Sequence, residues 1–168
     1  PYSNVDKIRT KNRRLGLGLM GIHEWLLKNG KKYGPDNELD KYLEIYAQSG
    51  KFANKWAKEW ELTKPIKTRA IAPTGTIAII GETTTGIEPI FCAAYKRRYK
   101  KGLIETDYQY VLDPTAKRLV DKGINPDTIE DAYSIDFERR LKFPAHVQQY
   151  VDHAISSTIN LPAWGSEA

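Results

Sequence analysis

Residues 68–89 constrain the possible fold of this 168-residue chain more than any other stretch. Residues 68–73 (TRAIAP) have the pattern of a short strand, and Pro73 ends it because proline has no backbone N–H to donate. A Thr-Gly-Thr turn follows, and residues 77–80 fit the first turn of a helix. A strand that passes through a tight turn into a helix is the repeating unit of α/β proteins. The stretch therefore predicts an α/β fold with parallel strands joined by helical crossovers.

The remaining segments fit this alternation and make the N-terminal half rich in helix. Leucines and isoleucines at helical spacing predict a helix over residues 13–29. Its glycines, Gly16, Gly18 and Gly21, indicate that another part of the protein packs very close to its backbone. An amphipathic pattern predicts a long helix over residues 37–61, whose tyrosines, tryptophans and phenylalanine we expect in the core. Further expected elements are a strand at residues 90–99, a helix capped by Asp113 with Pro114 at its first position, a short helix within residues 125–133, and a final helix at residues 144–156.

Length and composition fit one soluble globular domain or a piece of a larger one. Hydrophobic residues make up 40% and charged residues 28% of the chain, and no apolar run reaches the roughly 18 residues of a membrane span. The N-terminus lacks a signal-peptide pattern, and the single cysteine, Cys92, excludes an internal disulfide, so we expect a cytoplasmic protein without membrane contact. The net charge of +5 favours an anionic partner, but nucleic-acid binding would rest on charge alone because no binding motif accompanies it.

The Thr-Gly-Thr turn has the residue types of an anion site. Backbone amides at the start of a helix lack acceptors within the helix, and Gly75 would let a ligand approach them. Thr74 and Thr76 would add hydroxyl donors without adding charge. The same residues also fit a plain turn with a threonine as helix cap, and their spacing does not decide between the two. Neither a Walker A loop nor a GxGxxG pattern is present.

Four stretches in order resemble the large, catalytic chain of ribonucleotide reductase. They are RRLGLGLMGIHEWLL, RAIAPTGTIAIIGETTTGIEPIF, DPTAKRLV and VQQYVDHAISSTINLPAWGSE, which together extend over nearly the whole chain. The combination of APTGTI with STINLP is most similar to the adenosylcobalamin-dependent class II enzymes, while class I relatives have a related loop. The resemblance implies that residues 1–168 form a single segment of a ten-stranded α/β barrel domain, incomplete at both ends.

The resemblance also implies a function for the turn. In the family the matching loop binds the phosphates of a ribonucleoside di- or triphosphate, which the enzyme reduces to the deoxyribonucleotide by radical chemistry. The residues that would take this role are Ala72, Pro73, Thr74, Gly75, Thr76 and Ile77. Adenosylcobalamin, by the same resemblance, would be bound mainly outside this segment.

The family's chemistry needs three cysteines, and this chain has one. The resemblance places the catalytic thiols upstream of this segment, so we interpret Cys92 as a small apolar residue and assign no catalytic residue here. We expect the isolated segment to be inactive and to require the missing upstream part of the chain, or self-association, to cover its exposed sheet edges. The alternatives are a non-catalytic phosphate-binding or interaction fragment and, on charge alone, a nucleic-acid-binding domain.

The remaining ionisable residues are interpreted as structural. Glu88, between Ile87 and Pro89, is expected to be an ordered carboxylate rather than a catalyst. None of His23, His146 and His153 has a cysteine or histidine partner at the spacing of a metal site; His146 and His153 could share one face of the last helix, but two imidazoles make an incomplete ligand set. Asp152 fits an ordinary helix surface.

Overall fold

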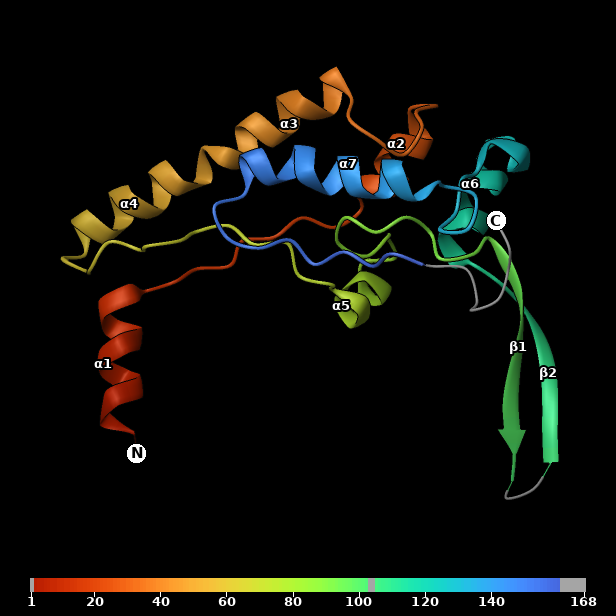
Figure 1. Cartoon of the computed structure of the whole chain (residues 1–168), viewed down its shortest axis with the longest axis horizontal. Coiled ribbons are helices and arrows are strands. Elements are labelled where there is room, and N and C mark those ends of the chain that lie inside the picture. The colour runs from red at the N-terminus through yellow and green to blue at the C-terminus, as the bar shows by residue number, and fades with distance from the viewer. Residues whose placement is uncertain (1, 103–104, 161–168) are drawn as a thin grey trace.

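The computed structural model describes residues 2–102 and 105–160. In chain order the elements are α1 (Ser3–Asn12), α2 (Ile22–Lys28), α3 (Asn37–Ala47), α4 (Ser49–Glu59), α5 (Gly75–Ile80), β1 (Ala94–Lys101), β2 (Glu105–Leu112), α6 (Pro114–Asp121), the 3-10 turn η1 (Pro126–Thr128), α7 (Phe137–Val147) and the 3-10 turn η2 (Gln148–Tyr150). Figure 1 shows α2, α3, α4, α6 and α7 on one side of a set of extended segments, α1 and the short helix α5 on the other side, and a hairpin that projects from one end.

Three extended segments lie side by side in parallel and form the centre of the fold. Residues 67–71 occupy the middle, with a parallel bridge from Arg69 to Leu17 on one side and from Ile71 to Ile155 on the other. The Ala70 N–H donates to the Leu17 carbonyl at 3.0 Å, and the Ile71 N–H donates to the Ala154 carbonyl, also at 3.0 Å. Helices connect the segments, so the predicted parallel α/β arrangement is confirmed, although each pairing is too short to count as a full strand.

The prediction of a helix over residues 13–29 is wrong for its first half. Residues 13–21 contain no helix, Leu17 among them forms a β-bridge, and α2 begins only at Ile22. Gly18 lies against the backbone of residue 70, where an added Cβ would come within 2.7 Å of the carbonyl oxygen. Gly21 has a left-handed backbone (φ 79°), which most residues avoid. Close packing therefore holds for Gly18, which lies against the segment at residues 67–70, and for Gly21, where an added Cβ would meet the Thr83 side chain, but not for Gly16, which has no atom within 4 Å of such a Cβ.

The predicted helix over residues 37–61 is present as two helices that meet at Gln48. Asp36 caps α3 by accepting from the N–H groups of Glu38 and Leu39. The expectation that the aromatic residues form core holds only in part, because Tyr46 is buried whereas Trp60 is 62% exposed. Only Ala57 of α4 is buried.

The C-terminal prediction is also only partly right. The last helix, α7, begins at Phe137 behind the cap Asp136, contains Pro144, and ends at Val147. Residues 151–160 are mostly extended instead of helical, because Ile155 and its neighbours pair with the central segment. The expected strand at residues 90–99 starts only at Ala94, and residues 125–133 contain the single turn η1. The cap at Asp113 is confirmed by bonds from Thr115 and Ala116 at 2.8 and 2.9 Å.

One core lies between the helices and the extended segments. It is formed by Ile22, Leu26, Tyr33, Leu39, Leu43, Tyr46, Ile71, Ile87, Ile135, Phe143, Val147 and Val151. Tyr33 is fully buried at its centre, where its ring meets that of Phe143 edge to face at 4.7 Å and its hydroxyl donates to the Ile87 carbonyl at 2.8 Å. Within the described part of the chain, none of the helices is long and apolar enough to cross a membrane.

Candidate functional site

The predicted phosphate loop, residues 72–77, lies at the end of the central extended segment and leads into α5. Thr74 has a left-handed backbone (φ 54°), which turns the chain sharply so that Gly75 can begin the helix. The first three N–H groups of α5, at Gly75, Thr76 and Ile77, have no acceptor inside the helix because of its geometry. No side chain caps this end, and all three residues are exposed. The loop therefore presents three adjacent backbone donors to the surroundings.

Thr74 makes a contact within the protein that its sequence does not suggest. Its hydroxyl does not cap α5, so the plain-cap interpretation is not supported. Instead Oγ1 accepts a hydrogen bond from the Gly86 N–H at 2.8 Å, which ties the loop to the turn that follows the helix. The hydroxyl proton of Thr74 remains available to a ligand, and the Thr76 side chain is exposed.

Gly75 stands next to open space. A Cβ built at this position would meet no protein atom within 4 Å, and the residue does not have a positive φ. Packing inside the chain therefore does not require a glycine here. Gly86 differs, because its φ is 44° and a Cβ there would lie 2.7 Å from the Ala72 carbonyl oxygen.

The threonines after α5 anchor α2. The Thr83 hydroxyl donates to the Glu24 carboxylate at 2.5 Å, and Thr84 Oγ1 accepts from the Glu24 N–H at 3.3 Å. Burial raises the pKa of Glu24, but hydrogen bonds from Lys28 and Thr83 outweigh it and hold the pKa below its usual value. The Thr83 and Thr84 hydroxyls therefore already bond to Glu24. The polar groups of residues 74–77 remain accessible to a ligand.

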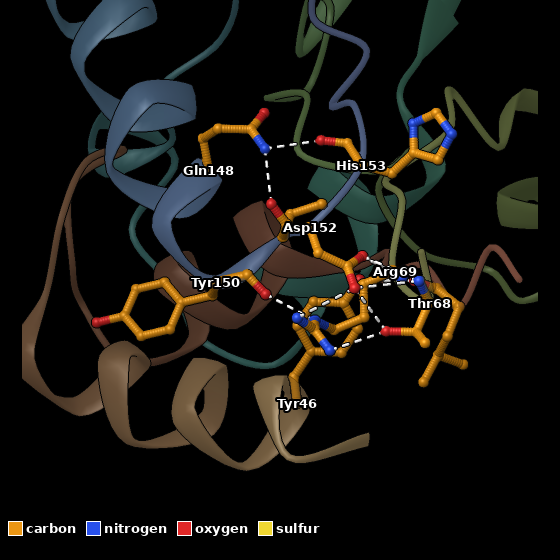
Figure 2. Close-up of polar contacts among 9 residues, drawn as sticks. Tyr46, Thr68, Arg69, Gln148, Tyr150, Asp152 and His153 are labelled. Carbon is orange, nitrogen blue, oxygen red and sulfur yellow. Dashed lines mark hydrogen bonds and ion pairs between the residues drawn. The ribbon is translucent and has the colours of Figure 1, made fainter. Parts of the chain in front are cut away.

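Asp152 bonds to Thr68 and Arg69 of the central extended segment, which leads into the loop (Figure 2). Its carboxylate accepts from the Arg69 N–H at 2.7 Å, from the Thr68 N–H at 3.1 Å and from the Thr68 hydroxyl at 2.8 Å. The Arg69 side chain in turn donates to the Tyr150 carbonyl at 2.9 Å. The expectation that Asp152 is ordinary helix surface is wrong, because residue 152 lies beyond the end of α7 and bonds to a segment 84 positions away.

The hydrogen bonds to Asp152 predict a pH-dependent contribution to stability. Burial raises its pKa, but the bonds from Arg69 and Thr68 outweigh burial and the pKa lies below its ordinary value. A lowered pKa stabilises the fold above the unfolded-state pKa of about 3.9 and loses that contribution as the pH falls through the folded value. We expect Asp152→Asn to lower the free energy of unfolding by about 1–3 kcal/mol at pH 7, and the difference to shrink below pH ~4.

Urea unfolding at several pH values would measure this effect. Asp121→Asn is the matched control, because that exposed carboxylate bonds only to Lys117 one helical turn away. We expect no measurable change from the control. An Asp152→Asn difference that stayed constant from pH 7 to pH 3 would contradict the assignment.

Glu88 forms a buried ion pair, as expected for a structural carboxylate. The Arg140 Nη2 donates to Glu88 Oε2 at 2.5 Å and also to the Thr158 carbonyl. The Thr158 N–H donates to Glu88 Oε1 at 2.6 Å, and the Arg140 Nη1 donates to the Tyr33 hydroxyl at 3.2 Å. Arg140 is 3% exposed. The expectation that Glu88 is an ordered carboxylate is thus confirmed, and its lack of a catalytic role stays a prediction. Its partner Arg140 carries no local sequence signal and was not predicted.

A cavity of about 760 Å³ lies beside the C-terminal half of α5. Its walls include Ile79, Thr85, Glu88, Arg118, Arg140 and Asn160. Residues 72–77 do not line it, so the loop and the cavity are separate features on either end of the same short helix.

His23, His146 and Cys92 lie in separate environments, and no hydrogen bond within the described residues joins one of them to another. His23 is fully buried, its Nδ1 accepts from the Ile90 N–H at 2.9 Å, and burial lowers its pKa to about 4. His146 Nε2 lies 2.6 Å from Asp40 Oδ1, and the Cys92 thiol is half-buried beside the Ala94 carbonyl. Among residues 2–102 and 105–160 no group of three metal-ligating side chains is found.

Comparison with known proteins gives consistent matches. Residues 66–167 match the family described as "Ribonucleotide reductase, barrel domain". A Mycobacterium phage D29 protein named putative adenosylcobalamin-dependent ribonucleoside-triphosphate reductase is 27% identical over 92% of this chain and 28% of its own length. A Thermoplasma acidophilum protein named vitamin B12-dependent ribonucleoside-diphosphate reductase is 26% identical over 96% of this chain and 26% of its own length. The chain therefore spans about a quarter of the length of these relatives.

Solved structures show the same fold. A crystal structure of a B12-dependent, class II ribonucleotide reductase superposes with a TM-score of 0.72 at 18% identity, over 93% of this chain and 27% of that one. The alpha subunit of a class Id reductase from Actinobacillus ureae superposes with a TM-score of 0.60 at 19% identity, over 87% of this chain and 33% of that one.

Proposed function

The chain belongs to the ribonucleotide reductase barrel-domain family, and from this we propose that it is the substrate-phosphate-binding segment of a ribonucleoside di- or triphosphate reductase. Residues 72–77 hold the phosphates in this proposal. The observation that carries it is the set of three exposed backbone donors at Gly75, Thr76 and Ile77, beside two threonine hydroxyls. Such donors stabilise an anion without a counter-charge, because the partial positive charge at a helix start favours it.

The segment's contribution to the reaction is to bind and orient the substrate. The Asp152 contacts fix the segment that carries the loop, and the Thr74–Gly86 bond fixes the loop itself. Holding the phosphate tail in this way places the ribose at a constant distance from the reactive groups of the complete enzyme. The thiol chemistry belongs to other parts of the complete reductase, since this chain contains only Cys92.

Adenosylcobalamin is the cofactor we propose for the complete enzyme, because the similar reductases are named for it. It supplies the radical when bound. Of the three histidines, His23 is buried and His146 is bonded to Asp40, so neither offers a free imidazole to a cofactor. We therefore propose that the remainder of the reductase holds the cofactor.

The complete architecture we propose is a ten-stranded barrel, of which residues 1–168 form one incomplete segment. The three parallel segments supply part of its wall. The exposed apolar side chains of α5 support the proposal that the barrel is incomplete here, because they mark a surface that another element would cover. They are Ile77, Ile79 and Ile80. The rest of the catalytic chain is the occupant we propose for that face, with a second copy of the segment as the alternative.

Gly75→Ala tests the loop directly. A methyl group at this position meets no protein atom, so we expect stability to change little, whereas a phosphate close to the backbone would clash with it. We expect the affinity for a ribonucleoside diphosphate, measured by isothermal titration calorimetry, to fall about tenfold, equivalent to about 1.4 kcal/mol. Thr76→Val should weaken binding in the same direction by removing one hydroxyl donor.

Gly34→Ala is the matched control, because Gly34 also borders open space and has no positive φ. We expect it to leave nucleotide binding unchanged. Equal affinity of Gly75→Ala and the unaltered chain would refute the loop assignment. A phosphate-binding fragment without chemistry would show the same binding results, but addition of the rest of the reductase chain would then restore no ribonucleotide reduction.

A further inference from the structure

The hairpin formed by β1 and β2 stands free of the rest of the molecule. The two antiparallel strands pair from Ala94 with Leu112 to Lys101 with Glu105, and Figure 1 shows the hairpin extending away from the helices. Every residue of β1 is exposed, and of β2 only Val111 is partly buried. Since an isolated two-stranded hairpin is only marginally stable in water, this one would gain stability from an additional element.

The two faces of the hairpin differ in charge. Side chains alternate between the faces along each strand, and the pairing register places opposite residues on the same face. One face, here called the cationic face, carries Lys96, Arg98, Lys100, Thr106, Tyr108 and Tyr110. It contains no carboxylate.

On the opposite face, positive and negative side chains balance each other. Its cations Arg97 and Lys101 share the face with Asp107 and Glu105, and Lys101 lies directly across from Glu105. The Tyr99 hydroxyl donates to Asp107 there at 3.2 Å. The acidic residues of β2 thus neutralise one face and leave the positive charge of the other uncompensated.

The contacts on the cationic face favour recognition by charge over base stacking. Lys96 Nζ lies 4.6 Å from the centre of the Tyr108 ring and 5.8 Å from that of Tyr110. The protein's own ammonium group therefore occupies ring surface that a nucleobase would need. Within the described residues, Arg98 and Lys100 make no side-chain hydrogen bond or ion pair.

We propose that an extended acidic segment of a partner protein adds to the free edge of β1 as a third strand, with alternate carboxylates beside Lys96, Arg98 and Lys100. The outer edge of β1 has backbone donors and acceptors that β2 does not use, and such an edge is where a peptide strand adds. The two-residue period of a strand matches acidic side chains at every second position to the three cations. A second copy of the hairpin is disfavoured, because like charges would lie opposite each other.

Fluorescence anisotropy with a labelled peptide of alternating glutamate and threonine, equal in length to β1, tests this on the full chain. The variant Arg98→Gln/Lys100→Gln should bind the peptide about tenfold more weakly than the unaltered protein. The matched control is Arg97→Gln/Lys101→Gln, which removes the same two charge types from the same strand but from the opposite face. It should weaken binding less than about threefold.

Two further measurements distinguish strand addition from loose attraction. The peptide should slow hydrogen exchange of the β1 amides that point away from β2, and its affinity should fall as salt is added. Equal losses in the two variants, no effect of salt, or no slowing of exchange would each overturn the proposal. So would binding of an oligothymidine of matched length without binding of the acidic peptide, which would indicate a nucleic-acid surface instead.

Discussion

Arg140→Met is expected to lower the free energy of unfolding by about 3–5 kcal/mol, because it leaves the Glu88 carboxylate buried without its counter-charge. The two side chains are 3% and 17% exposed, so water replaces the lost ion pair only in part. The substitution also removes the donors to Tyr33 and Thr158, which join the core to the last extended segment. A loss of this size is comparable to the whole stability of many domains, so we expect a large fall in the urea midpoint.

Lys142→Met is the control on the same helix. Lys142 pairs with Glu138 in an ion pair whose side chains are 67% and 65% exposed, and such pairs contribute little. We expect no measurable change from this variant. A double-mutant cycle with Glu88→Leu should recover part of the loss, because it removes the unpaired charge. A cost for Arg140→Met as small as that for Lys142→Met would show that Glu88 is solvated and the pair unimportant.

Phe143→Ala is the second substitution with a large expected effect. The ring is fully buried and meets Tyr33 at the centre of the core. Removing it loses apolar burial and leaves a cavity, which typically costs about 3–5 kcal/mol. Thermal unfolding followed by circular dichroism would measure the change as a lower melting temperature with unchanged helix content in the folded state.

Phe137→Ala provides the comparison, since Phe137 starts the same helix but is 65% exposed. We expect it to change stability by no more than about 0.5 kcal/mol. Similar losses in both variants would mean that the helix α7, rather than the packing of Phe143, accounts for the effect.

Elements controlled by neighbouring residues were predictable from sequence. Asp113 and Pro114 start α6 as expected, because a cap and a proline act within one helical turn. The turn at residues 74–76 and the helix after it were likewise predicted, since Pro73 ends the preceding segment and Gly75 opens the next. The role of that turn as a phosphate site stays a prediction.

The secondary-structure predictions were wrong where contacts with residues distant in sequence override the local pattern. The leucine spacing before α2 is helical, but the backbone of residues 15–17 bonds to residues 67–70 and is extended. Similarly, Ile155 fits a helical face but pairs with Ile71. The aromatic residues of α4 match a core pattern, although the described residues cover only Ala57 on that helix.

The sequence by itself determined the family, the α/β class and the residue types of the loop, because these depend on motifs of a few adjacent residues. The tertiary structure alone decided that Asp152 anchors Thr68 and Arg69, that Arg140 neutralises Glu88, and that the hairpin separates its charges by face. The physical reason is that a buried polar group must find a partner, and the partners here are brought together by folding across tens of residues.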